Sequence, residues 1–135
     1  MGKAEDAEIR DILAGIKSIA VVGLSDKPDR PSYHVASFLK SKGYVVIPVN
    51  PAKEEILDRK CFASLEEIPE KIDAVVVFRR SEDTVPVAMS AAKTKAKVLW
   101  LQLGIKNDEA RRIAEKAGLK VVMDRCMAIE HGRLM

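Results

Sequence analysis

The 135-residue sequence has few cysteines, few aromatic residues and no long apolar run. Cys61 and Cys126 are far apart and show no CxxC spacing, which argues against a zinc site and against a disulfide framework. The longest apolar stretches are strand-length, well short of the ~20 residues that a membrane span requires. The charged N-terminus lacks the apolar core of a secretory signal. These absences predict a cytoplasmic protein with no membrane partner.

Amide side chains and basic blocks are also scarce. The chain has one glutamine and two asparagines, whereas lysine and glutamate are plentiful, a bias typical of thermophile proteins. The net charge is +3, but basic and acidic residues are interspersed, so we expect no nucleic-acid partner. With 47% hydrophobic residues, the chain has enough apolar material for one folded domain over residues 1–135.

Five short apolar runs predict β-strands that are covered on both faces, as in a parallel sheet. They span residues 18–24, 44–49, 73–78, 98–101 and 120–123. We expect Pro48 and Pro51 to end the second strand. The connection over residues 52–71 should be rich in loops.

Helical patterns lie before, between and after these strands. An amphipathic leading helix is predicted within residues 1–16, and further helices should begin at Pro31, cover 82–94 and follow a capping Asn107. Residues 126–134 should form a short final helix. Strands that alternate with helices specify a doubly wound, Rossmann-like α/β fold. Ligands of such folds bind beyond the carboxyl ends of the strands, where the strand order reverses.

The segment after the first strand has one glycine of the dinucleotide fingerprint G-x-G-x-x-G, Gly23. A glycine there allows a tight turn, and the amides at the start of the following helix form an anion site. The side chains of Ser25, Ser32 and Tyr33 could add hydroxyl donors. The alternative interpretation is a plain strand-to-helix turn.

The segment after the second strand lacks the acidic residue that holds the ribose of NAD. It reads Asn50, Pro51, Ala52, Lys53. A lysine in place of a carboxylate disfavours NAD and suits a ligand with an additional phosphate.

Two adjacent arginines, Arg79 and Arg80, follow Phe78 at the end of the third strand. Guanidinium groups match phosphates bidentately and can stack on a purine, so the pair predicts a phosphate-bearing ligand. A solvated helix entrance is the alternative. Gln102, after the fourth strand, is a further candidate, and we expect Asp124 and Arg125 after the fifth to pair with each other.

Several of these motifs together resemble the small, stand-alone CoA-binding proteins. That family is related to the CoA-binding domain at the N-terminus of the succinyl-CoA synthetase alpha subunit. The resemblance covers roughly residues 15–134 and departs from the family at residues 94–97. It rests on residues 22–25, 28–33, 48–51, 64–69, 77–81, 100–105 and 122–126.

The resemblance implies that the ligand is coenzyme A or an acyl-CoA. The loop at 23–25 and the helix start at Ser32 and Tyr33 would hold the pyrophosphate. The residues that follow the second and third strands would surround the adenosine and its 3′-phosphate. The full candidate set is Gly23, Leu24, Ser25, Lys27, Arg30, Ser32, Tyr33, Asn50, Pro51, Lys53, Phe78, Arg79, Arg80 and Gln102.

We expect the chain to be non-catalytic on its own. Cys126 is the one plausible nucleophile, but nucleophilic catalysis needs a base that a third group holds in place, and no such set is visible. A packing role suits Cys126 better, although a mixed disulfide with the CoA thiol is a weaker hypothesis. The alternative functions are a detached subunit of an acyl-CoA-metabolising enzyme and an NAD(P)-binding redox protein. A protein partner or a homo-oligomer is left open.

Overall fold

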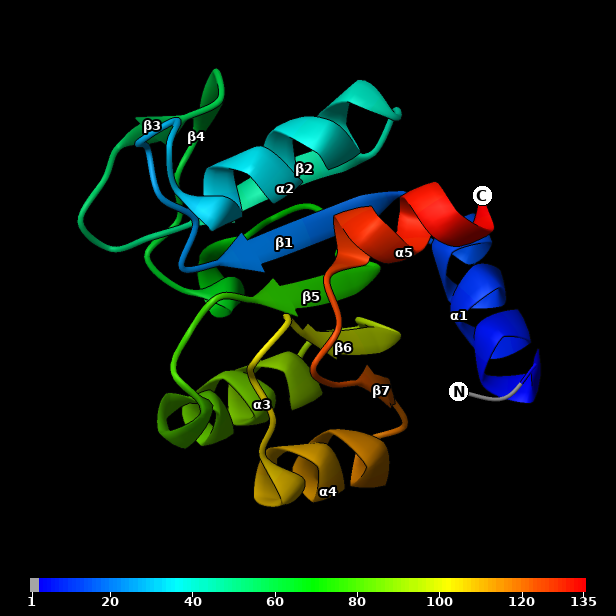
Figure 1. Cartoon of the computed structure of the whole chain (residues 1–135). Coiled ribbons are helices and arrows are strands. Elements are labelled where there is room, and N and C mark those ends of the chain that lie inside the picture. The colour runs from blue at the N-terminus through cyan, green and yellow to red at the C-terminus, as the bar shows by residue number, and fades with distance from the viewer. Residues whose placement is uncertain (1–2) are drawn as a thin grey trace.

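The computed structural model describes the backbone of residues 3–135 and the side chains of residues 5–135. Five parallel strands form one sheet in the order β2-β1-β5-β6-β7 (Figure 1). Their bounds are β1 Ser18–Val22, β2 Val45–Val49, β5 Ala74–Val77, β6 Val98–Leu101 and β7 Lys120–Val122. The strand order reverses between β1 and β5, so their carboxyl ends form the switch point of a doubly wound sheet. The predicted α/β fold is confirmed.

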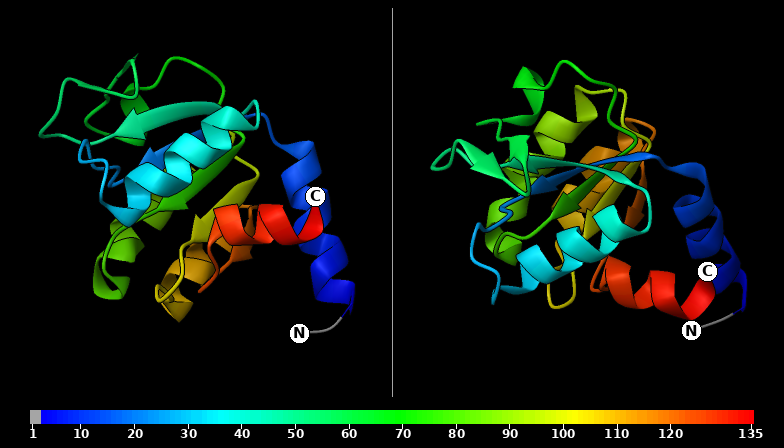
Figure 2. Two further views of the ribbon diagram at one scale, coloured as in Figure 1. Left: turned by 45° about the horizontal axis from the view of Figure 1, so that its top comes forward. Right: turned by 90° about the horizontal axis from the view of Figure 1, so that it is seen from above.

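Five helices flank this sheet in two layers, with α1, α2 and α5 on one face and α3 and α4 on the other (Figure 2). Their bounds are α1 Lys3–Gly15, α2 Pro31–Ser41, α3 Thr84–Ala92, α4 Asp108–Lys116 and α5 Met127–Leu134. Two short 3-10 turns, η1 Leu65–Glu67 and η2 Ser81–Asp83, precede β5 and α3. Residues 1 and 2 of the predicted leading helix lie outside the described residues.

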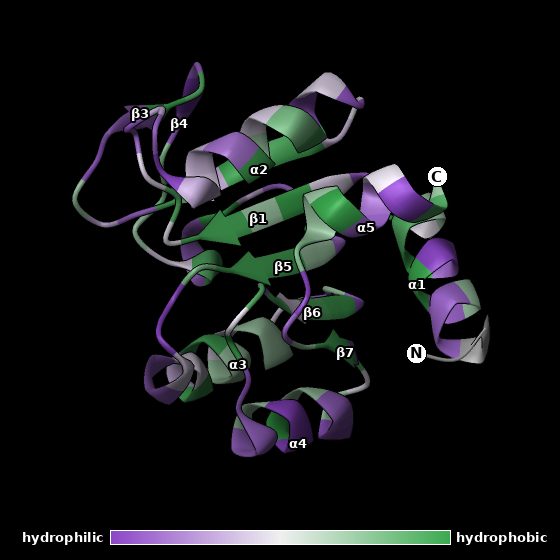
Figure 3. Ribbon diagram, in the orientation of Figure 1, coloured by the Kyte–Doolittle hydropathy of each residue, from purple (hydrophilic) through white to green (hydrophobic). Residues whose placement is uncertain are grey.

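The strands are apolar on both faces, as the sequence pattern predicts (Figure 3). Ile19 and Val21 of β1 pack with α1, α2 and α5, whereas Ala20 and Val22 pack with α3 and α4. Trp100 of β6 is fully buried, and its indole Nε1 donates to the carbonyl oxygen of Arg125 over 2.8 Å. The hydrogen bond removes the cost of burying an unpaired indole N–H.

The second strand ends at Val49, between the two prolines that were expected to stop it, and Pro48 itself lies within the strand. β2 lies at the edge of the sheet, where a residue without an N–H is tolerated because one side of the strand carries no ladder. On that outer side the carbonyl oxygen of Pro48 accepts from the amide of Phe62 at 3.0 Å, and the amide of Asn50 donates to the carbonyl of Phe62 at 2.9 Å. Residues around Phe62 therefore line the carboxyl half of this edge.

The connection predicted as loop-rich contains a two-stranded hairpin, β3 Glu55–Ile56 and β4 Arg59–Lys60. Its turn residues Leu57 and Asp58 both have positive φ, 52° and 63°. A hairpin turn of this hand is usually built from Asn-Gly or Asp-Gly. The Leu-Asp pair does not carry that signal, which is why the sequence does not predict the hairpin.

Ion pairs join α1 to α5 and to Arg125, which lies just before α5. Glu130 is buried, and its two carboxylate oxygens accept from Arg125 Nη1 at 2.9 Å and from Arg133 Nε at 2.8 Å. Arg133 also pairs with Asp6 at 2.8 Å, and Arg125 with Glu5 at 2.8 Å.

The predicted pairing of Arg125 with Asp124 is wrong. The backbone of Asp124 is left-handed, with a φ of 59°. Its Oδ1 accepts from the amide of Gly104 at 2.6 Å instead of pairing with Arg125. Arg125 is left to bind the acidic residues of α1 and α5.

Candidate functional site

A cleft of about 530 Å³ opens at the carboxyl ends of β1, β2 and β5, where the strand order reverses. In Figure 1 these strand ends point away from the side of the molecule where the two termini lie. The position is the one expected for a ligand in a doubly wound sheet. Ten of the predicted site residues line the cleft: Gly23, Ser25, Lys27, Arg30, Ser32, Asn50, Lys53, Phe78, Arg79 and Arg80.

Gly23 is required where three strand ends meet. Its amide donates to the carbonyl of Val49 at 3.0 Å, and the amide of Phe78 donates to the carbonyl of Val22 at 2.8 Å. Its φ is +86°, and a Cβ at this position would lie 2.3 Å from the carbonyl oxygen of Phe78. A larger residue would therefore push the loop after β1 away from the end of β5.

Hydroxyl groups shape the loop between β1 and α2. Ser32 Oγ accepts from the amide of Ser25 at 3.0 Å, and Ser25 Oγ accepts from the amide of Lys27 at 3.1 Å. Pro31 stands at the start of α2, and the first turn of this helix carries no acidic side chain. The positive end of the helix dipole thus faces the cleft without an acidic neighbour in its own turn, which favours a bound anion.

Five cationic side chains line the cleft, and two of them have acidic partners. Lys53 Nζ lies 3.2 Å from Asp26 Oδ2, and Arg80 Nε lies 3.0 Å from Asp83 Oδ2. The hydrogen bond and charge of Asp83 raise the pKa of Arg80, although its side chain is 77% exposed. Among residues 5–135, no carboxylate lies within 4.0 Å of Lys27, Arg30 or Arg79, the other three: these are the cations of the cleft that are free to meet an anion.

Four predicted site residues do not line the cleft. Leu24 is fully buried, but its carbonyl oxygen accepts from Asn50 Nδ2 at 3.0 Å and so fixes the end of β2. Tyr33 packs against the core, and Pro51 borders a neighbouring hollow of about 560 Å³. Gln102 is buried, and its Oε1 accepts from the first amide of α5 at 3.3 Å, which links β6 to that helix.

Three residues that sequence reasoning did not select line the cleft as well: Asp26, Pro31 and Ile105. Asp26 follows Ser25 directly, but an acidic residue is not what a phosphate loop predicts. Ile105 is brought in by the loop after β6, where the amide of Asp124 donates to its carbonyl oxygen at 3.0 Å. The position of Ile105 in the segment that follows a predicted strand was the available signal, although the predicted set includes only Gln102 of that segment.

Cys126 does not line the cleft. It stands at the N-terminus of α5 and is partly buried against the core, in keeping with the packing role. The mixed disulfide with CoA stays a prediction, which needs the thiol end of the ligand to reach the start of α5. Cys61 borders the neighbouring hollow and is buried, and this burial raises the pKa of its thiol.

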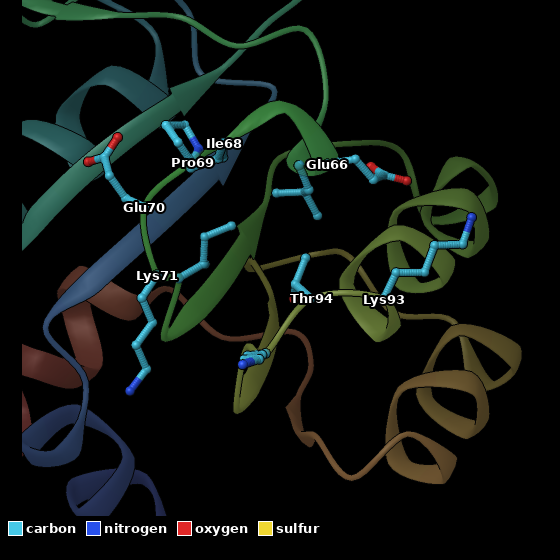
Figure 4. A pocket seen from close by; sticks show the side chains of 10 residues that line it. Glu66, Ile68, Pro69, Glu70, Lys71, Lys93 and Thr94 are labelled. Carbon is cyan, nitrogen blue, oxygen red and sulfur yellow. The ribbon is translucent and has the colours of Figure 1, made fainter.

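A second hollow, of about 450 Å³, lies at the amino ends of β5 and β6 (Figure 4). The side chains of Lys71 and Lys93, two of the charged residues that line it, point away from each other. Over residues 3–135, no group of three or more histidine, cysteine or acidic side chains is placed to hold a metal ion. A membrane-spanning helix would need to be longer and more apolar than any helix in the same range.

A family model described as a CoA binding domain matches residues 17–132 of the chain. This chain belongs to the CoA-binding domain family. The resemblance inferred from the sequence motifs is thus confirmed.

The relatives of this chain include small proteins that match it along nearly their whole length and large enzymes that match it over one part. The chain is 46% identical to the uncharacterized protein YneT of Bacillus subtilis, with 97% of each chain covered. A solved hypothetical protein from Pyrococcus horikoshii superposes with a TM-score of 0.93 at 46% identity, over 96% of this chain and 91% of that one. A 4-hydroxybutyrate–CoA ligase (ADP-forming) of Nitrosopumilus maritimus is 31% identical over 84% of this chain, which spans 18% of the ligase.

Proposed function

We propose that the chain binds coenzyme A or an acyl-CoA in the cleft at the switch point. The observation that carries the proposal is the convergence there of the Gly23 turn, the N-terminus of α2 and five cationic side chains. CoA carries a pyrophosphate and a 3′-phosphate, so it supplies the anions that such a cleft is built to hold. The match to the CoA-binding domain family supports the choice of this nucleotide over others.

The polar groups suggest how the ligand is oriented. The pyrophosphate would lie against the Ser25–Ser32 loop and the start of α2, with Lys27 and Arg30 beside it. The 3′-phosphate would lie between the loops after β2 and β5. Arg79 suits that role better than Arg80 because Arg80 is already paired with Asp83.

The end of β2 distinguishes this proposal from NAD binding. Asn50 stands where an NAD-binding protein places its acidic residue, and its side chain is bonded to the Leu24 carbonyl and to the amide of Ala52. We therefore expect CoA to stabilise the fold and NAD to leave it unchanged. A ligand at a hundredfold its dissociation constant adds about 2.7 kcal/mol to the free energy of unfolding.

Thermal melts with CoA, acetyl-CoA and NAD test the proposal. A clear upward shift of Tm with CoA and none with NAD is the expected result. Equal shifts with NAD, or no shift with CoA, would remove the support for a CoA site. Mass spectrometry of the ligand that co-purifies with the protein would identify the acyl group.

A second candidate function is that of a detached subunit of an acyl-CoA-metabolising enzyme. The observation in its favour is the match to part of a much longer CoA ligase. Under either function we propose that the chain alone does not turn over acyl-CoA. Assays of acyl-CoA hydrolysis and CoA ligation on the purified chain, with and without any co-purifying protein, separate the two. Turnover by the chain alone that disappears when cleft residues are mutated would contradict the non-catalytic role.

A further inference from the structure

Asp26 is an acidic side chain inside a cleft whose other charged lining residues are cationic. Its Oδ2 lies 3.2 Å from Nζ of Lys53, and the two side chains are 39% and 41% exposed. Ion pairs with this exposure contribute about 0–1 kcal/mol to stability. Stability of the fold therefore gives little reason for a carboxylate at this position.

The ion pair joins two loops that another contact already joins. Asn50 Nδ2 donates to the carbonyl of Leu24 at 3.0 Å, which ties the loop after β2 to the loop after β1. The backbone around Lys53 is held by the same asparagine, because the amide of Ala52 donates to Asn50 Oδ1 at 2.9 Å. Asp26 thus fixes the flexible end of the Lys53 side chain rather than the path of the chain.

We propose that Asp26 is a built-in counter-ion, which a phosphate group of the ligand displaces from Lys53. The inference rests on the proposed function and adds to it a mechanism by which the ligand-free cleft holds its own anion. A phosphate offers more oxygen acceptors and more charge than one half-exposed carboxylate, so it is the stronger partner for an ammonium group. The unbranched stem of lysine lets Nζ turn from Asp26 to the ligand without a backbone change.

A counter-ion of this kind weakens ligand binding, because the ligand must compete with it for Lys53. Replacing Asp26 by asparagine keeps the size of the side chain and removes its charge. Asp26→Asn should bind CoA about three- to tenfold more tightly than the unmodified chain, which corresponds to about 0.7–1.4 kcal/mol. Calorimetric titration with CoA measures the change directly.

Two further variants isolate the mechanism. Asp29→Asn removes the same charge from an exposed position of the same loop that does not line the cleft, and it should change CoA affinity less than twofold. In a Lys53→Met background, Asp26→Asn should also gain less than twofold, because the lysine for which carboxylate and phosphate compete is absent. The four proteins with and without these two changes form a double-mutant cycle.

Each outcome decides the inference. Weaker CoA binding by Asp26→Asn would show that the carboxylate positions Lys53 for the ligand. A gain in CoA affinity that is as large in the Lys53→Met background as in the unmodified chain would show that Asp26 repels the ligand directly. Either result overturns the counter-ion role. A wild-type chain that does not bind CoA at all would overturn the proposed function instead. The same cycle with inorganic pyrophosphate then decides the inference, and the absence of a gain in Asp26→Asn would reject it.

Discussion

Arginine has opposite uses in two regions of this molecule. At the junction of α1 and α5, Arg125 and Arg133 share the buried carboxylate of Glu130 and reach further acids on α1. In the switch-point cleft, Arg30 and Arg79 have no carboxylate within 4.0 Å among residues 5–135. Paired arginines stabilise the packing of two helices, whereas unpaired ones leave a cationic surface for a ligand. If the two regions are separate, a change at the junction of α1 and α5 should alter stability and leave ligand binding unchanged, and a change at Arg79 should do the reverse.

The largest effect should come from removing Glu130. Truncation of Glu130 removes two charge-assisted hydrogen bonds to a buried carboxylate, each worth about 1.5–3 kcal/mol. Arg125 and Arg133 keep their partners on α1, so the expected cost is about 3–5 kcal/mol, from the lost bonds alone. We expect Glu130→Ala to lower the free energy of unfolding by that amount in denaturant titrations and to leave the affinity for CoA of the still-folded protein unchanged. Glu115→Ala, at an exposed position of α4, is the matched control and should change stability by less than about 0.5 kcal/mol. A loss of CoA affinity in Glu130→Ala would show that the two regions are coupled.

Gly23→Ala is a change in the cleft that should lower both the stability of the fold and the affinity for CoA. A residue with a Cβ pays about 1–2 kcal/mol for left-handed backbone, and here the Cβ also meets the carbonyl oxygen of Phe78. We expect a loss of at least about 2 kcal/mol in unfolding free energy together with weaker CoA binding. Gly43→Ala, which also has a positive φ but open space around its Cβ, measures the backbone part alone. Equal losses in the two variants would mean that the close approach to β5 has no energetic weight.

Arg79→Ala should change binding and leave stability unchanged. A charge-assisted contact with the 3′-phosphate contributes about 1.5–3 kcal/mol. CoA should therefore bind roughly ten- to a hundredfold more weakly to Arg79→Ala, whereas dephospho-CoA should be affected little. Arg80→Ala should cost less, because this guanidinium is exposed and paired with Asp83. Calorimetry with both ligands decides the assignment: equal losses for CoA and dephospho-CoA would place Arg79 elsewhere, for instance against the adenine.

The smallest expected effect is a difference in pH dependence: stability and CoA affinity should fall in different pH ranges. Burial alone would raise the pKa of Glu130, but the hydrogen bonds from Arg133 and Arg125 outweigh it and leave the pKa below its ordinary value. The stability from this carboxylate is present above its unfolded pKa, about 4.3, and is lost as the pH falls through the lower folded pKa. As the pH falls, CoA affinity should decline before stability does, near pH 6, because a phosphate monoester gains its second proton there. Glu130→Gln should flatten the acid limb of the stability curve alone; a change in the pH dependence of CoA binding would contradict this.

Sequence reasoning succeeded where the signal is local. The apolar runs predicted all five strands of the main sheet, and Asn107 caps α4 as expected, with its Oδ1 accepting from the amide of Ala110 at 2.9 Å. It failed where side chains meet across the fold. Arg125 finds Glu5, 120 positions away, rather than its neighbour Asp124. The side chain of Gln102 points into the core, where it accepts from the first amide of α5. The sequence alone does not show whether a polar residue at the end of a strand points into the cleft or into the core.

The two edges of the main sheet differ in how easily another strand could add to them. At β2, Pro48 offers no N–H, and the backbone around Phe62 takes the carboxyl half of the edge. At β7 the strand is three residues long. Unprotected edges are where sheets of different molecules join and aggregate. The half of this edge that lies beside the cleft is thus covered against strand addition, so the cleft can stay open at the end of β2 without offering that part of the strand as a template for intermolecular pairing.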